Sequence, residues 1–169
     1  MKAGRDDLQA LVEQVRRAAG EAPPGPVLYA LVSLAGDAER THLLAGRERI
    51  EEGGTCWQVL VLTDTSLIWV EATGPQADWS LQMPESDQET LTGWTRHLGS
   101  IKALHVKGAQ SVDDFGPGGG PSNWEWECTW ALDVDGVGLI QVPLVGYNRN
   151  GGRAEQLEAF AVAVRTVLA

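Results

Sequence analysis

The clearest hydrophobic pattern in the chain is an alternation with a period of two between positions 124 and 135. The even positions are Trp124, Trp126, Cys128, Trp130, Leu132 and Val134, and the odd positions are Glu125, Glu127, Thr129, Ala131, Asp133 and Asp135. Because successive side chains of a strand point to opposite faces, this pattern predicts a strand with one buried and one solvated face. Asp135-Gly136 then predicts a hairpin with a type I′ turn. Residues 138–144 are the returning strand, and Pro143 indicates either an edge strand or the end of the strand.

Other apolar runs have the length of strands. Residues 55–62 and 67–71 are apolar on both faces and flank a polar turn, so they predict a central hairpin. The apolar run 27–35 predicts another strand, as do residues 100–107. Residues 41–50 fit a strand or a helix, and Trp79 with Leu81 suggests a short strand.

Two segments have the apolar spacing of helices. Residues 6–19 carry an apolar stripe and end before a glycine and three prolines, and residues 153–168 carry a second stripe. The first stripe is Leu8, Leu11, Val12 and Val15, and the second is Leu157, Phe160, Ala161, Val164 and Leu168.

These elements predict an α+β fold. Short strands at hairpin spacing favour an antiparallel bent barrel or sandwich of about seven strands, with an N-terminal helix and a C-terminal helix that caps the open end. A chain of 169 residues suits one domain. We therefore expect residues 1–24 to be a helix with a proline-rich connection, and residues 25–169 to be a single α+β domain.

The second hairpin also carries a resemblance to a known superfold. It runs Val61, Leu62, Thr63, Asp64, Thr65, Ser66, Leu67, Ile68, Trp69 and Val70. This stretch and the order of elements over residues 27–168 resemble the pleckstrin-homology-like (PH-like) superfold, including its bacterial members and the related GRAM domains. The resemblance implies a binding module. Lipid-binding members carry basic residues in the first hairpin loop, whereas residues 36–40 here are Gly-Asp-Ala-Glu-Arg, so phosphoinositide binding is not expected.

The charge of the chain narrows the choice of partners. It has 23 acidic residues against 13 Lys and Arg, a formal net charge of -10. Such a field repels phosphate backbones and anionic lipids, and it attracts a basic protein or peptide. The chain shows no signal-peptide pattern and no apolar run of membrane-spanning length, so we expect it in the cytoplasm.

No catalytic, metal or cofactor motif is present. The glycine loop at 116–120 lacks the Lys-Ser/Thr of a phosphate-binding loop, and Asp133-Val134-Asp135-Gly136 lacks the later ligands of a calcium loop. His42, His97 and His105 have no metal-ligand spacing. Cys56 and Cys128 lie in strand patterns typical of inert thiols, although a site formed by a cysteine and a histidine in space stays open. We therefore expect no cofactor and no enzymatic activity.

Two sets of polar residues are candidate binding sites. Glu125, Glu127, Asp133 and Asp135 form either a solvated sheet face or a docking face for a basic partner. Arg149, Gly151, Gly152 and Arg153 form either an anion site or a turn with a helix N-cap. The seven tryptophans fill a core or line a ligand pocket.

Three functions fit this sequence, in a clear order. The first is a non-enzymatic binding module for a protein or peptide. The second is an acidic inhibitor or immunity-type protein that neutralises a basic partner. The third is a carrier of a small apolar ligand inside the barrel.

Overall fold

The computed structural model of the chain describes residues 5–36, 40–50, 53–77, 79, 89–111, 126–146 and 153–169. It contains two antiparallel sheets and three α-helices, so the predicted α+β class is confirmed. The seven strands agree with the number expected from the sequence. The strands pair as two separate sheets, and no pairing among the described residues closes a barrel.

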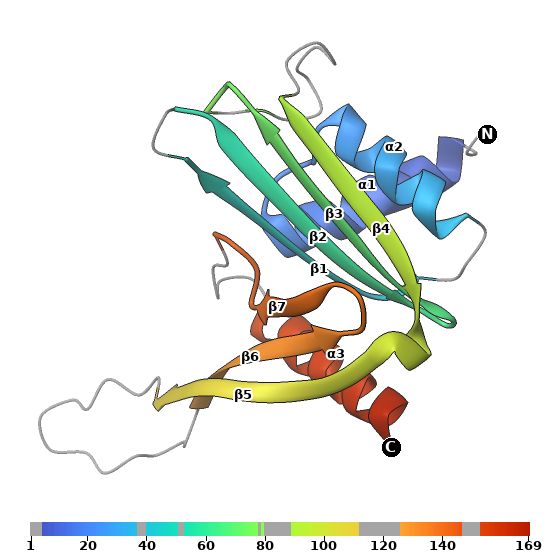
Figure 1. Cartoon of the computed structure of the whole chain (residues 1–169). Helices are drawn as coiled ribbons and strands as arrows, with labels where there is room; N and C mark the ends of the chain where they lie inside the picture. The colour runs from blue at the N-terminus through green and yellow to red at the C-terminus, as the bar shows by residue number, and fades with distance from the viewer. Residues whose placement is uncertain are drawn as a thin grey trace, which may run out of the picture.

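The larger sheet has four strands in the order β1-β2-β3-β4 (Figure 1). Their bounds are Arg40–Arg49 for β1, Thr55–Thr63 for β2, Ser66–Gly74 for β3 and Thr90–His97 for β4. The predicted central hairpin is confirmed as β2 and β3. The ambiguous segment 41–50 belongs to strand β1, which pairs with β2 from Arg40↔Thr63 to Arg49↔Thr55.

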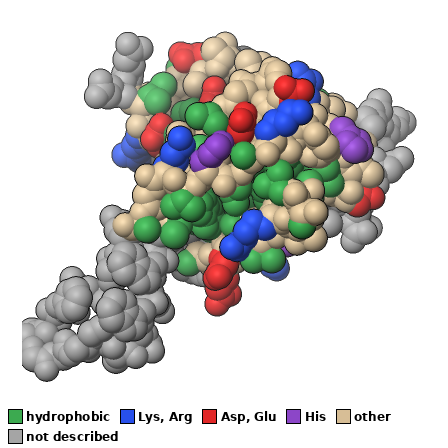
Figure 2. Space-filling view, turned by 60° about the horizontal axis from the view of Figure 1, so that its bottom comes forward, with side chains coloured by type: hydrophobic (Ala, Val, Ile, Leu, Met, Phe, Trp, Pro, Cys, Tyr) green, Lys and Arg blue, Asp and Glu red, His purple; other side chains and the backbone are tan. Residues whose placement is uncertain are grey.

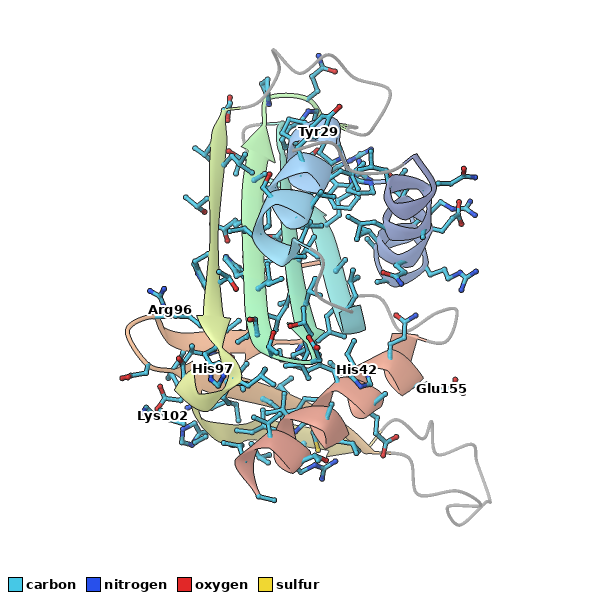
Figure 3. The ribbon with its side chains drawn as sticks, turned by 90° about the vertical axis from the view of Figure 1, so that its right-hand side faces the viewer. Tyr29, His42, Arg96, His97, Lys102 and Glu155 are labelled. Atoms are coloured by element: carbon cyan, nitrogen blue, oxygen red, sulfur yellow. The ribbon has the colours of Figure 1, made fainter. Side chains whose placement is uncertain are left out.

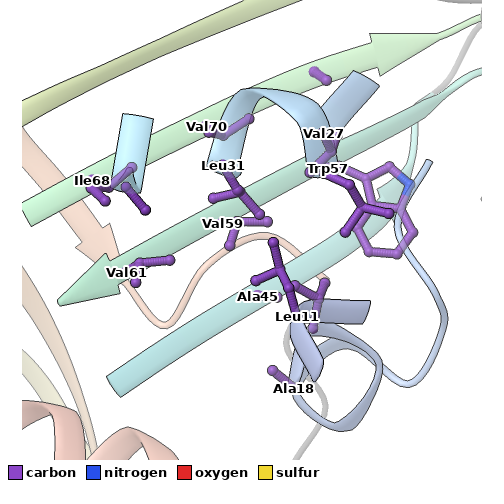
Figure 4. Close-up of a cluster of buried hydrophobic side chains, with 14 of the residues drawn as sticks. Leu11, Ala18, Val27, Leu31, Ala45, Trp57, Val59, Val61, Ile68 and Val70 are labelled. Carbon is purple, nitrogen blue, oxygen red and sulfur yellow. The ribbon is translucent and has the colours of Figure 1, made fainter. Parts of the chain in front are cut away.

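Helices α1 (Arg5–Ala19) and α2 (Gly25–Ala35) cover one face of this sheet. Figure 4 shows the core that they enclose, where apolar side chains of both helices meet those of β1, β2 and β3. Helix α1 is the predicted first helix, and its Leu11, Val15 and Ala18 are buried in this same core. The N-terminal helix is therefore packed on the sheet.

The prediction of a strand at 27–35 is wrong, because these residues form α2. Val27, Leu31 and Ala35 are buried at helical spacing, while Tyr29 is 58% exposed. Pro26 lies in the first turn, where its fixed φ favours a helix, and Gly36 follows the last turn with φ 56. A short, nearly continuous apolar run does not separate a buried strand from a buried helix by periodicity alone.

The smaller sheet has the order β5-β6-β7, and a third helix packs near it. The bounds are Ile101–Ser111 for β5, Trp126–Val134 for β6, Gly138–Val142 for β7 and Arg153–Leu168 for α3. The predicted strand at 100–107, the alternating strand, its returning partner and the last helix are all confirmed. A short 3-10 helix, η2 (Leu98–Ser100), joins β4 to β5 at the corner between the sheets.

The predicted type I′ turn at Asp135-Gly136 is wrong in detail. Three residues, 135–137, separate the paired ends of β6 and β7, and Val137 N–H donates to the Val134 carbonyl at 3.0 Å. Gly136 has φ 71, whereas none of the described non-glycine residues, Asp135 included, has a positive φ. Only one central residue of the turn is therefore left-handed, and a type I′ turn needs two.

A second core lies where the smaller sheet and α3 meet the other face of the larger sheet. It contains Leu44, Leu60, Leu62, Leu67, Ile101, Leu132, Val134, Ile140, Val142, Leu144, Leu157, Phe160 and Val164. Leu132 and Val134 of β6 and Leu157, Phe160 and Val164 of α3 are buried in this core, as the sequence predicts, whereas Leu168 at the end of the predicted stripe is exposed. The larger sheet is thus buried on one face by helices and on part of the other by the second sheet.

Strand β4 is missing from the sequence-based expectations. Seven of its eight residues are exposed and Trp94 is half-buried, so the strand shows no alternation of buried and solvated positions. Trp79 was expected in a short strand, but it lies in a connection and is fully buried. Leu81 and the predicted loop at 113–123 lie outside the described residues.

Candidate functional site

The larger sheet has an open face, which we define as the face turned away from α1 and α2. Figure 3 shows the two helices on one side of this sheet, with the smaller sheet and α3 at one end of the molecule. On the open face, Trp69 of β3 is the cross-strand neighbour of both Leu60 of β2 and Trp94 of β4. Leu60 is fully buried against the second core, whereas the two tryptophans are only half-buried.

A groove of about 470 Å³ lies at the corner where the open face meets the smaller sheet. We call it the corner groove. Its walls are Gln58, Trp69, Trp94, Val137, Leu139, Ile140, Gln141, Pro143, Leu144 and Val145. Most of these side chains are apolar, none is charged, and two are large aromatics. Concave, mostly apolar surfaces with a few polar groups are the usual form of binding sites.

Strand β7 forms one wall of the corner groove and is an edge strand. It pairs with β6 on one side and with no other described strand on the other side. An edge strand presents unpaired N–H and C=O groups to any chain that lies beside it. Leu139 of β7 is 54% exposed and Val137, just before the strand, is 38% exposed. Apolar side chains and free backbone groups therefore occur together along this wall.

Gln58 ties the groove to the rest of the fold. Its Nε2 donates to Glu71 Oε2 at 2.7 Å, and its Oε1 accepts from the backbone N–H of Val145 at 3.3 Å. These two bonds link β2 to β3 and to the connection between β7 and α3. The side-chain amide is therefore held in one orientation at the wall of the groove, as a positioned polar group requires.

The open face carries negative charge beyond the groove. The pKa of the Cys56 thiol is raised to about 11, first by burial and then by the carboxylates of Glu71 and Glu48. Cys56 is therefore a thiol at neutral pH and is not activated as a nucleophile. The carboxylates of Glu71 and Glu48 near this thiol place negative charge on the open face, which favours a positively charged partner.

The acidic residues predicted as a docking face are only partly placed. Asp133 is half-buried in β6, and Asp135 is exposed in the turn that follows, with Oδ2 3.6 Å from Lys102 Nζ. Glu125 lies outside the described residues, as does the side chain of Glu127. Because β5 also contributes Lys102, the charge near Asp135 is mixed, and the acidic docking face stays a prediction.

The predicted anion site also falls mostly outside the described residues. Arg149, Gly151 and Gly152 lie outside them, and Arg153 begins α3 with a side chain that is likewise not described. The anion site therefore stays a prediction.

The remaining chemistry-bearing residues are dispersed. His42, His97 and His105 lie on β1, at the junction of β4 with η2, and on β5. No group of three or more potential metal ligands occurs in the described part of the chain. Cys56 and Cys128 are both free.

The structure divides the tryptophans between the two predicted roles. Trp57 and Trp79 are fully buried, and Trp57 Nε1 donates to the Trp79 carbonyl at 3.1 Å. Trp69 and Trp94 contact the second core and also line the groove. Leu139 is not among the binding residues predicted from the sequence. A signal was available, because Leu139 is an apolar residue on the solvated face of a predicted terminal hairpin that ends at Pro143.

A second, wider groove of about 720 Å³ lies between α3 and the β2–β3 turn. Ala159, Val162 and Val167 are among its apolar walls, and Asp64, Glu155 and Glu158 give it acidic ones. Figure 2 shows the underside of the molecule, where apolar side chains gather in the middle with charged side chains around them. The described walls of this second groove do not include both an unpaired strand and aromatic side chains. The corner groove has both, so it is the better candidate site.

No family model, curated protein or solved structure matches the chain. Among the described residues, no helix is both long and apolar enough to cross a membrane.

Proposed function

We propose that the protein is a non-enzymatic binding module of the cytoplasm that takes an extended, basic segment of a partner protein into the corner groove. One observation carries this proposal: half-buried Trp69 and Trp94 face the groove beside the edge of β7 that pairs with no other described strand. Aromatic side chains at a surface groove contribute large contact areas. An edge strand contributes backbone hydrogen bonds that depend little on the sequence of the partner.

The bound segment would add a strand to β7. In this mode alternate side chains of the segment point to opposite sides, so one set packs on Trp69 and Trp94 while the other set faces solvent or Leu139. The backbone hydrogen bonds contribute affinity, and the surface beside Trp69 and Trp94 determines which side chains of the segment fit. A segment that alternates apolar and polar residues fits this wall best.

The charge of the molecule supports a basic segment. The net charge is -10, and Glu48 and Glu71 lie on the open face next to the groove. Lys or Arg side chains of the segment would lie toward these carboxylates. Such complementarity accelerates association and excludes acidic competitors.

The PH-like architecture is part of the same proposal. Seven antiparallel strands followed by a C-terminal helix over the second core support it. The pairing into two separate sheets departs from a closed barrel. A binding groove beside an edge strand is compatible with either arrangement, since it requires only that β7 have no neighbour.

The acidic-inhibitor function is the second candidate, and the negative potential near Cys56 favours it. It differs in the form of its partner, which would be a folded basic protein. The carrier function has less support. The cavity between α1, β1 and α3 is about 10 Å³, room for one water at most, and the described cores are filled by side chains.

Selection of short random peptides on the whole protein tests the proposal. We expect enriched peptides to alternate apolar and basic residues and to change tryptophan fluorescence on binding. Leu139→Lys should weaken binding at least about tenfold, because it places a like charge and a polar head beside the basic segment. Val106→Lys is the matched control, since Val106 is 67% exposed on β5, away from the groove, and should bind as the wild type does.

Enrichment of peptides without basic residues, or equal binding to the Leu139→Lys variant, would refute the groove as the site. Binding only to folded basic proteins, with loss of affinity on reversing Asp133 and Asp135, would favour the inhibitor function instead.

A further inference from the structure

The edge strands of the two sheets differ in how far they are protected from pairing. β1 packs against α1 and the 144–146 segment. β5 has register irregularities at Ile101/Ala103 and Val106/Gly108 and carries Lys102 and Lys107. Bulges and lysines of this kind keep natural edges from joining other chains.

β4 has none of these protections. Its register with β3 runs without a break from Thr73↔Thr90 to Ser66↔His97, and the strand contains neither Lys nor Pro. Figure 3 looks onto this side of the molecule, where β4 and α2 form the surface and Tyr29 and Arg96 are labelled. Tyr29 is 58% exposed and Leu91 is 37% exposed, so apolar side chains accompany the open edge.

The charges along β4 are complementary to a reversed copy of the same strand. Exposed Glu89 precedes the strand, and exposed Arg96 and His97 end it. When two antiparallel copies lie side by side, the acidic start of each strand meets the basic end of the other. A twofold interface repeats this match at both ends of the junction. No such match arises when the strands run parallel.

We propose that two copies of the chain join through β4 into a continuous eight-stranded antiparallel sheet. The twofold axis passes between the two copies of Gly93, which is the middle residue of the stretch 89–97. In this register Glu89 lies opposite His97 of the second copy and on the same face of the sheet, whereas Arg96 points to the other face. A twofold axis perpendicular to the sheet puts the same face of both copies on the same side. The sequence numbers of two residues that lie directly opposite each other therefore differ by an even number.

This dimer extends the open face across both copies. Thr92 of one copy lies opposite Trp94 of the other on the open face, because the two residues are equally far from Gly93 on either side of it. Trp94 lines the corner groove, so the second copy adds Thr92 beside the groove of the first. The dimer does not depend on peptide binding, and each proposal can fail without the other.

Sedimentation equilibrium of the full chain over a range of concentrations tests the dimer. Ionic strength is held near 0.15 M, where the Debye length is about 8 Å and screens the repulsion between two acidic molecules. Glu89→Arg and His97→Glu should each weaken dimerisation about tenfold, since each places two side chains of like charge opposite each other at both ends of the junction. The double variant exchanges the charges and should restore the wild-type constant. Val106→Lys is the control, since Val106 is exposed on β5, and it should dimerise as the wild type does.

A chain that is monomeric throughout the concentration range overturns the proposal. The proposal is also overturned if the double variant dimerises more weakly than either single variant. Exchanging the two charges restores the pairing of opposite charges only if the β4 edges of the two copies lie antiparallel.

The register has its own test. Leu91→Cys combined with Thr95→Cys should form intermolecular disulfides under mild oxidation, because these two positions lie opposite each other across the junction. Leu91→Cys alone should not form them. A dimer in which the paired cysteines stay reduced would refute the register centred on Gly93.

Discussion

At the scale of single residues, similar side chains have different roles because the fold places them differently. Trp57 and Trp79 are fully buried and share a hydrogen bond, whereas Trp69 and Trp94 are half-buried and face a groove. The sequence predicts that tryptophans fill a core or line a pocket, but it does not say which. That choice depends on which face of the larger sheet the smaller sheet covers, and this is a long-range contact.

Cys56 makes the stability of the protein dependent on pH above neutrality. Its pKa is raised to about 11 in the folded chain by burial and by Glu71 and Glu48, against an ordinary value of 9.0. Between these two values the unfolded chain releases the thiol proton and the folded chain keeps it. The stabilising contribution is therefore complete below pH 9 and is lost progressively as pH rises toward 11.

Denaturant unfolding at pH 8 and pH 10.5 measures this contribution. We expect the free energy of unfolding to fall more steeply with pH in the wild type than in Cys56→Ala, which has no thiol to titrate. If the free energy of unfolding falls equally with pH in the two proteins, the pKa of the Cys56 thiol is not raised in the folded chain.

At the scale of elements, the sequence predicts best those segments whose two faces differ. β6 and α3 have a clear apolar face and were placed correctly, because one face of each is buried and the other is solvated. α2 was assigned as a strand, because its nearly continuous apolar run hides the helical spacing of its buried residues. β4 was missed because an open edge strand buries almost nothing and so shows no pattern.

The candidate site was predictable only in part. The tryptophans and the terminal hairpin were recognised, but their meeting at a corner depends on how η2 turns the chain between the two sheets. No local pattern specifies that turn, and residues of β2, β3, β4 and β7 meet only after it. The sequence therefore predicts a binding face only where the pattern is local, at the acidic positions of β6, and it does not predict the groove.

One close approach holds the connection between β7 and α3 against β1. A Cβ added to Gly46 would overlap the carbonyl oxygen of Val145 and contact Leu144. We expect Gly46→Ala to lower the free energy of unfolding by about 2 kcal/mol or more, because backbone cannot move aside cheaply. Gly99→Ala is the control, since its added Cβ would meet only the exposed ring of His97, with Nδ1 at 3.3 Å and Cε1 at 3.8 Å. Similar losses for both variants in urea unfolding would contradict this role of Gly46.

At the scale of the whole molecule, α1 belongs to the same packed body as the sheet. Leu11 and Val15 are fully buried in the first core, and Glu21, after the helix, pairs with Arg47 of β1 at 2.8 Å. The boundary that the sequence predicts at residue 24 separates α1 from the domain, although side chains of α1 are buried in the first core. The sequence suggested that boundary because three prolines follow the helix, and prolines mark a connection without saying whether the helix packs on the domain.

Removal of residues 1–24 therefore tests the extent of the domain. Burial of two large aliphatic side chains stabilises the fold by about 3–6 kcal/mol, a large part of the roughly 5–15 kcal/mol of a typical domain. We expect the shortened chain to unfold at much lower denaturant concentration or to lose cooperative unfolding. If it unfolds at the same midpoint as the full chain, residues 25–169 form the independent domain that the sequence predicts.

The central claim is that an extended basic segment pairs with β7 in the corner groove. Amide hydrogen exchange of the whole protein, with and without a selected peptide, tests it most directly because it reports backbone hydrogen bonds strand by strand. We expect slower exchange in Gly138–Val142 on peptide binding, with exchange in β5 unchanged. Protection that appears on β5 or α3 while β7 stays unchanged would contradict it.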